Sequence, residues 1–389
     1  MASSPEDFQA IAQRGLAAWQ QGDALAARAA FDQVAGAGCA SPQLWLLLAQ
    51  ACEALGDLGA SDAALDPVLT DDPRNPYALL MKGDIHTARG DDRAASAWYN
   101  RALVEAPQFK DLPADLIERL ERARNAIAAS TSKFEAHLAG ALASKDVDPA
   151  AIAPRFAEAL DIMAGRREIF PQQPTSFFYP GLPHKQFFAN EDFAWVAALE
   201  AAAPAMRAEV EAILAADAGL SPYVVSRGNR PPGEHSLLND PSWSAFYLWQ
   251  DGALVADNAA RCPNSMAALA GLPIPHIAKR SPMVLFSVLR PHTHIEAHNG
   301  MLNTRLICHI PLIVPEECRL RVGNETRAVE FGKAMIFDDS IEHEAWNDSD
   351  ETRVVLLFEI WRPELSEAER RALTVMYEAI SGYGAGPTA

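Results

Sequence analysis

Histidines cluster in the second half of the chain, where their number and spacing could support metal chemistry. Four of the ten histidines fall within residues 292–309, and a fifth, His343, follows them. The four are His292, His294, His298 and His309. A neutral imidazole is a good ligand for a first-row transition metal. A lone histidine in a strand is usually structural, but this cluster, with an arginine on the strand expected next, favours a metal site.

The arginine is Arg353, ten residues after His343, which leaves room for a short turn and the start of a strand. A planar guanidinium binds a carboxylate through two parallel hydrogen bonds. Non-haem iron oxygenases need two imidazoles, open coordination positions, and a cation for the distal carboxylate of 2-oxoglutarate. The clustered histidines and Arg353 match these required residue types.

Other polar residues in the same segments have more ordinary interpretations. His292 and His294 have the spacing of an alternative metal pair on one strand face, but supporting or structural roles are favoured for them. Asp338 and Asp339 could serve as a ligand or a base. They are interpreted instead as capping a turn and orienting His343.

Short strands must position these side chains. The stretch 305–312 alternates, which places Arg305, Ile307 and His309 on one face and Cys308 on the other. The longest candidate, 352–361, places Arg353 and Glu359 on one face. Several short strands with glycine turns between them predict a sandwich or barrel. The expected strands are 242–248, 283–289, 305–312, 319–322, 326–330, 334–337 and 352–361.

The first 109 residues repeat with a period of 34 residues. Gly-Asp pairs begin at Gly22, Gly56 and Gly90. A glycine can end one helix in the left-handed conformation, and an aspartate can cap the next. Small residues and large apolar residues recur at the same interval, as expected for closely packed helix pairs. These residues are Gly15, Ala49 and Gly83, and Phe31, Leu65 and Tyr99.

This pattern resembles the tetratricopeptide repeat over about residues 6–109. An alanine-rich bundle is the alternative, but several position classes share one period. Such repeats form a solenoid whose concave side often binds peptides. Residues 112–145 read as a capping helix, and a last helix at about 150–164 leads into the second domain. We expect a helical domain at residues 1–148 and a second domain at residues 149–389.

The second domain resembles the aspartyl/asparaginyl β-hydroxylases, which are iron(II)- and 2-oxoglutarate-dependent oxygenases on a double-stranded β-helix, a jelly-roll or cupin-like fold. The resemblance runs from about Phe177 to Arg371. It rests on four motifs, at residues 291–303, 308–312, 337–347 and 361–365. The fold class implied is α+β and multidomain, with an all-α solenoid before the oxygenase domain.

The resemblance implies a role for each matching residue. His298 and His343 stand where the family has its two iron ligands, and Arg353 where it binds 2-oxoglutarate. Ser287 and His309 match further cosubstrate-binding positions, and Trp243 matches a tryptophan near them. Gly300 replaces the carboxylate that most of the wider superfamily has two residues after the first histidine, but this family also has glycine there.

One position departs from the family. Ile307 stands where an arginine is usual, two residues before His309. Because Arg305 lies two residues further back on the same face, we hypothesise that it supplies the missing charge to cosubstrate or substrate.

The activity implied is hydroxylation of an unactivated C–H bond with iron(II), 2-oxoglutarate and O2. The expected target is the β-carbon of an aspartate or asparagine in a peptide or protein, recruited by the repeats. Two alternatives stay open. One is the lipid-hydroxylating branch of the family, and the other is a non-catalytic interaction protein built on the repeats.

Composition limits the partners and the compartment. Lysine and arginine number 33 against 51 aspartate and glutamate, so the net charge is −18 and nucleic acid is not an expected partner. No run of 18 apolar residues occurs, so no membrane span is expected, and the first residues do not read as a signal peptide. The five scattered cysteines fit reduced thiols and predict a cytoplasmic protein.

Overall fold

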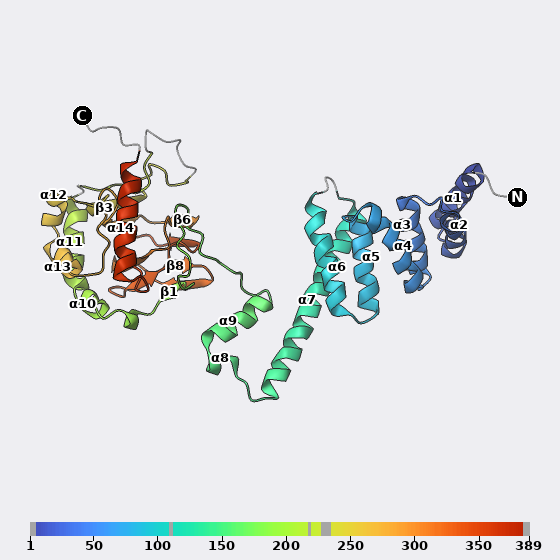
Figure 1. The fold of residues 1–389 in the computed structure, drawn as a ribbon, viewed down its shortest axis with the longest axis horizontal. Coiled ribbons are helices and arrows are strands. Elements are labelled where there is room, and N and C mark those ends of the chain that lie inside the picture. The colour runs from blue at the N-terminus through green and yellow to red at the C-terminus, as the bar shows by residue number, and fades with distance from the viewer. Residues whose placement is uncertain (1–4, 109–111, 217–218, 227–234, 384–389) are drawn as a thin grey trace. The chain divides into compact units, whose positions relative to one another are not determined.

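The computed structural model describes residues 5–108, 112–216, 219–226 and 235–383. The chain forms two compact units, Met1–Ala164 and Gly165–Ala389 (Figure 1). The sequence-based boundary lies earlier, between residues 148 and 149. The difference concerns two short helices, α8 (Pro149–Ile152) and α9 (Pro154–Met163), which contain no buried residue.

In the first unit, helices α1 to α6 form three antiparallel pairs, as the repeats predict, and α7 follows them. Each consecutive pair of helices from α1 to α7 is in contact. Asp23, Asp57 and Asp91 cap α2, α4 and α6, and each carboxylate accepts a hydrogen bond from the N–H three residues later. The seven helices are α1 (Pro5–Gln20), α2 (Ala24–Gly36), α3 (Pro42–Ala54), α4 (Leu58–Asp71), α5 (Pro76–Ala88), α6 (Asp92–Glu105) and α7 (Ala114–Ala143).

The small residues of the repeat are needed for close packing between paired helices. A Cβ added to Gly15 would lie 2.6 Å from the Phe31 ring, and one added to Gly83 would lie 2.3 Å from the Tyr99 ring. Both distances are shorter than real Cβ contacts, so the aromatic side chains occupy the space above these glycines. The structure thus confirms the predicted close packing of the paired helices at these small residues.

The second unit is built on two antiparallel sheets. The larger has the order β1-β10-β7-β12-β5-β3-β2, with β4 also paired to β3, and the smaller has the order β6-β11-β8-β9. The larger contains β1 (Phe187–Phe188), β2 (Ser221–Pro222), β3 (Trp243–Gln250), β4 (Ala253–Leu254), β5 (Val284–Leu289), β7 (Arg305–Ile313), β10 (Met335–Phe337) and β12 (Arg353–Trp361). The smaller contains β6 (Thr293–His298), β8 (Cys318–Val322), β9 (Glu325–Ala328) and β11 (His343–Asn347).

The seven expected strands all occur, with ends shifted by at most two residues. The strands β6 and β11 were not among them, although they carry His298 and His343. An antiparallel β domain is thus confirmed, while its description as a double-stranded β-helix stays a prediction.

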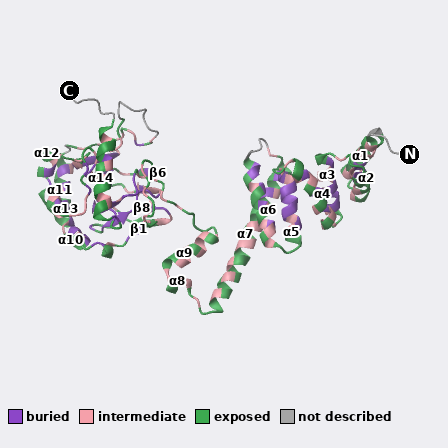
Figure 2. Ribbon diagram, viewed as in Figure 1, coloured by how far each residue is buried: buried purple, intermediate pink, exposed green. Residues whose placement is uncertain are grey.

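The two faces of the large sheet meet different partners. One face, with Cys308 and Phe358, packs against helices α10 (Val196–Ala201), α11 (Ala203–Ala216) and α13 (Pro263–Leu269). Figures 1 and 2 show these three helices together on one side of the unit. The other face packs against the small sheet through a second core that includes Ile307 of β7 and Leu320 of β8. Because side chains alternate along a strand, the residues of this second face lie between the sheets. The remaining helices of the unit are η2 (Asn190–Asp192), α12 (Ala256–Ala260) and α14 (Glu367–Gly382).

Candidate active site between the two sheets

A cavity of about 280 Å³ opens between the two sheets. Strands β3, β5, β7 and β12 of the large sheet and β6, β8 and β11 of the small sheet line it. All the site residues named from the sequence line this one cavity: Trp243, Ser287, His298, Arg305, His309, His343 and Arg353.

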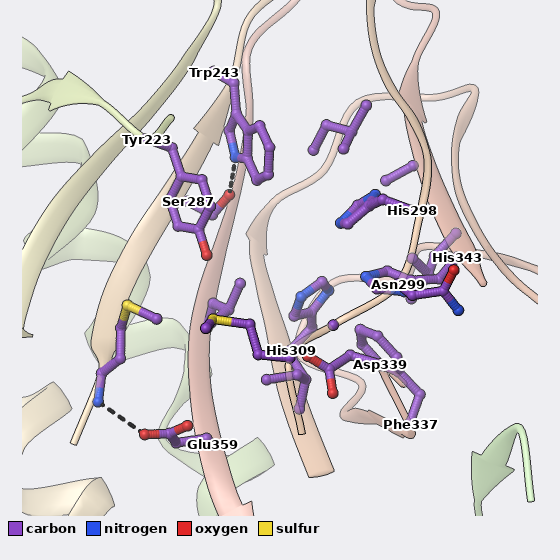
Figure 3. Close-up of a pocket in the computed structure, with 18 of the residues that line it drawn as sticks. Tyr223, Trp243, Ser287, His298, Asn299, His309, Phe337, Asp339, His343 and Glu359 are labelled. Atoms are coloured by element: carbon purple, nitrogen blue, oxygen red, sulfur yellow. Dashed lines mark hydrogen bonds between the residues drawn. The ribbon is translucent and has the colours of Figure 1, made fainter. Parts of the chain in front are cut away.

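His298 and His343 form a pair at one wall of the cavity (Figure 3). They are register partners on β6 and β11, and their ring centroids lie 4.2 Å apart. Nδ1 of His298 lies 2.7 Å from the Glu296 carbonyl, and Nδ1 of His343 lies 3.0 Å from the Ile341 carbonyl. A carbonyl only accepts, so each Nδ1 carries the proton and each Nε2 keeps the lone pair that a metal requires.

Burial keeps these imidazoles neutral. It lowers the pKa of His343 to about 3, with the neighbouring His298 acting in the same direction. Burial also lowers the pKa of His298. Neutral rings with free Nε2 lone pairs fit the donor chemistry of iron(II). Among the described residues, no group of three histidine, cysteine, aspartate or glutamate side chains is arranged to hold a metal.

Arg353 is buried, with only 2% of its surface exposed, and it forms no ion pair with a carboxylate of the described residues. Within the described part of the chain, its Nε has no hydrogen-bond partner. Burial lowers the pKa of Arg353 to about 10, so the group is still charged at neutral pH. A buried guanidinium of this kind fits the carboxylate of a cosubstrate such as 2-oxoglutarate.

Further polar groups lie in the same cavity. The buried Nδ1 of His309 also lacks a partner among the described residues. Burial, followed by the nearby charge of Arg353, lowers the pKa of His309 well below its ordinary value. The indole N–H of Trp243 donates to Ser287 Oγ over 3.1 Å. These groups can supply hydrogen bonds to an anionic cosubstrate bound at Arg353.

Arg305 does not have the free charge that the sequence-based hypothesis assigned to it. Its guanidinium pairs with the buried carboxylate of Glu359, and its Nη2 lies 3.4 Å from Asp339 Oδ2. Burial alone would lower the pKa of Arg305, but these two carboxylates outweigh it and raise the pKa. The charge of Arg305 is therefore balanced inside the protein.

Asp338 and Asp339, which the sequence suggested would act alike, have separate roles. Asp338 Oδ1 accepts from the Ser340 N–H at 3.0 Å and caps the turn, while its Oδ2 binds Arg362 at 2.7 Å. Asp339 instead lines the cavity, where burial raises its pKa to about 6 and Arg305 opposes that rise. The sequence did not identify Asp339 or Glu359 as cavity residues, although strand alternation had placed Glu359 on the face of Arg353.

Gly300 leaves room for the Asp339 carboxylate. A Cβ added at residue 300 would lie 2.0 Å from Asp339 Oδ2, and the Gly300 N–H donates to the Asp339 carbonyl over 2.6 Å. The glycine is thus required by space, because any side chain there would displace a cavity carboxylate.

Gly300→Ala is accordingly expected to reduce turnover at least tenfold and to destabilise the fold by about 1–3 kcal/mol, the usual range for overpacking. Gly140→Ala on α7 is the matched control, because the added methyl group would have no described atom within 4 Å apart from its chain neighbours and the backbone of its own helix. It should leave turnover unchanged and be neutral or slightly stabilising. Turnover and thermal unfolding of both variants test this, and a Gly300→Ala enzyme with normal turnover would contradict it.

His292 and His294 lie outside the cavity, as the favoured interpretation expected. Nε2 of His292 lies 2.9 Å from Asp350, and Nε2 of His294 lies 2.9 Å from Glu344. The His294 ring also stacks on Trp346, with 4.9 Å between centroids. Neither histidine lines the cavity that contains His298.

The fold and the cavity together define a protein of helical repeats followed by an antiparallel β-sheet domain, with a cavity between its sheets that histidine and arginine side chains line. Residues 200–363 match the family model for aspartyl/asparaginyl β-hydroxylase, and residues 13–61 and 56–108 match the tetratricopeptide repeat. The chain therefore carries N-terminal tetratricopeptide repeats and a C-terminal aspartyl/asparaginyl β-hydroxylase domain.

Individual relatives support the same division. Human aspartyl/asparaginyl β-hydroxylase is 35% identical over 158 residues, which are 40% of this chain and 21% of that protein. The chain thus spans about a fifth of the length of this relative. The ornithine lipid ester-linked acyl 2-hydroxylase of Rhizobium tropici is 35% identical over 193 residues, 49% of this chain and 65% of that protein.

Among solved structures, the tetratricopeptide domain of Arabidopsis OM64 matches 31% of this chain and 97% of that chain, with 20% identity and a TM-score of 0.27. In the described ranges, no helix is both long enough and apolar enough to cross a bilayer.

Proposed function

We propose that this chain is an iron(II)- and 2-oxoglutarate-dependent dioxygenase that hydroxylates the β-carbon of an aspartate or asparagine in a peptide or protein. One observation supports the proposal above all. A neutral histidine pair with free Nε2 lone pairs shares a buried cavity with an arginine whose Nε lacks a partner among the described residues. Bound iron(II) would supply the activation of dioxygen that hydroxylation of a C–H bond requires.

Residues of the cavity would bind the metal, bind the cosubstrate and exclude water. His298 and His343 would hold the metal through Nε2, and the backbone carbonyls of Glu296 and Ile341 orient the two rings at Nδ1. Arg353 binds the distal carboxylate of 2-oxoglutarate, and His309 and Ser287 add hydrogen bonds. The apolar side chains of Ile295 and Leu320 line the cavity and exclude water from the reacting groups.

The proposal extends to partners and compartment. The tetratricopeptide repeats recruit the peptide or protein substrate, since stacked helical repeats present extended binding surfaces. The five cysteines are free, which suits a reducing cytoplasm where iron stays as iron(II).

A second candidate function is hydroxylation of a lipid acyl chain. It is favoured by the similarity to the Rhizobium acyl 2-hydroxylase, because the match covers 65% of that relative but only 21% of the human β-hydroxylase. Incubation with ornithine lipid and with peptides, each followed by mass spectrometry for one added oxygen, separates the two substrate classes.

The proposed cofactor chemistry is tested without knowing the substrate. Anaerobic addition of iron(II) and 2-oxoglutarate should give a weak visible charge-transfer band, and admission of oxygen should produce succinate. Removal of iron with a chelator should abolish both signals, and returning iron(II) should restore them. A protein that gives neither band nor succinate would contradict the proposal.

A further inference from the structure

A charged triad occupies the cavity beside the histidine pair. It consists of Arg305 on β7, Glu359 on β12 and Asp339, which follows β10. Glu359 is 1% exposed and Asp339 is 5% exposed. The triad places two carboxylates around one guanidinium, so it offers no excess positive charge to a substrate.

Some polar atoms of the triad form hydrogen bonds, whereas two others have no partner among the described residues. Both oxygens of Glu359 are engaged, one by Arg305 and the other by the Met283 N–H over 3.3 Å. Arg305 uses its two terminal nitrogens, Nη1 and Nη2, on the two carboxylates. In contrast, Arg305 Nε and Asp339 Oδ1 are buried and have no partner among the described residues.

The cavity thus combines an unpartnered donor on Arg305 with an unpartnered acceptor on Asp339. A primary carboxamide is complementary to this combination, because its oxygen accepts and its NH2 group donates. A carboxylate could also accept from Arg305, but it has no N–H to donate to Asp339 Oδ1. Arg353, the cavity cation that the triad does not neutralise, is taken by the cosubstrate in the proposed function.

We propose that the side chain hydroxylated by this chain carries a carboxamide, so that asparagine is preferred to aspartate. The inference rests on the proposed function and narrows it to one of the two side chains in the family description. Leaving a buried polar atom unpaired costs about 1–3 kcal/mol, which corresponds to roughly tenfold to hundredfold discrimination in kcat/KM.

Two synthetic peptide libraries test the preference with the full chain. Both have randomised flanking residues, and they differ only in a central asparagine or aspartate. With iron(II), 2-oxoglutarate and oxygen present, mass spectrometry should find one added oxygen on the central residue at least tenfold faster in the asparagine library. Equal rates, faster oxidation of the aspartate library, or oxidation of neither library while succinate is formed would overturn the inference.

The variant Glu359→Gln tests the role of the triad. It removes one carboxylate from Arg305, keeps an oxygen that can accept from the Met283 N–H, and so should raise the aspartate rate relative to the asparagine rate. Glu364→Gln is the matched control, since Glu364 pairs with Arg362 and does not line the cavity. It should leave the ratio unchanged, and an unchanged ratio in a folded Glu359→Gln protein would count against the triad.

Failure of the inference is distinguishable from failure of the proposed function. Succinate formation from 2-oxoglutarate without peptide reports cofactor chemistry alone, whichever library is preferred. A protein that forms succinate but prefers aspartate retains the proposed function and loses the carboxamide preference. A protein that never forms succinate loses both.

Discussion

The His298→Ala variant is expected to lose the anaerobic iron–2-oxoglutarate band and more than about a hundredfold of its turnover. Losing even an outer partner of a metal-binding histidine typically costs 10–100-fold, and this change removes a proposed ligand itself. The fold should survive, because His298 is a partly exposed side chain at the end of β6. Iron titration followed by succinate measurement tests both effects.

His294→Ala is the matched control for this variant. His294 lies on the same strand, four residues earlier, but it pairs with Glu344 outside the cavity. Its loss should leave the band and turnover within about twofold of the original protein, because a surface pair contributes at most about 1 kcal/mol. If His298→Ala retained turnover, or if both variants lost it equally, the assigned histidine pair would be wrong.

The contrast between His298 and His294 also marks a limit of sequence reasoning. Simple alternation along β6 would place both side chains on one face. In the structure, Ile295 pairs with Ala345 and His298 pairs with His343. An advance of three residues on β6 therefore matches an advance of only two residues on β11. This bulge turns His298 toward the cavity while His294 stays outside. The motif resemblance singled out His298, which lines the cavity, whereas alternation alone could not distinguish it from His294.

The charged triad shows a second limit. The expected strands and their alternation correctly placed Arg305 and His309 on the cavity face of β7. The pairing of Arg305 with Glu359 depends on the register between β7 and β12, where Arg305 lies opposite Trp361 and Glu359 lies one diagonal step away. Local sequence determines which side chains share a face, whereas register across strands distant in sequence decides which charges neutralise one another.

The Arg353→Met variant is expected to bind 2-oxoglutarate at least about a hundredfold more weakly. A charge-assisted hydrogen bond contributes about 1.5–3 kcal/mol, and a two-pronged contact with a carboxylate makes two of them. Methionine is long and apolar, so it fills much of the same space on β12 without the charge. The measurement is the concentration of 2-oxoglutarate that gives half-maximal succinate formation.

The same change should stabilise the protein when no cosubstrate is bound. Burial lowers the pKa of Arg353 from its ordinary value to about 10 on folding, so the folded state binds this proton less tightly than the unfolded chain. The buried charge therefore costs stability below a pH of about 10, and that cost disappears only as the pH rises past this value. Removing it should raise the unfolding temperature by roughly 2–4 °C for each kcal/mol recovered.

Arg362→Met provides the opposite case in the same domain. Arg362 is completely buried, but unlike Arg353 it has a counter-charge, because it pairs with the buried Asp338 at 2.7 Å. This ion pair supports the turn before His343. Loss of Arg362 leaves the buried Asp338 without its ion-pair partner, which typically costs 3–5 kcal/mol. Two buried arginines exchanged for the same residue should thus shift the unfolding temperature in opposite directions. A destabilised Arg353→Met protein would mean that Arg353 supports the fold instead of being held ready for an anionic cosubstrate.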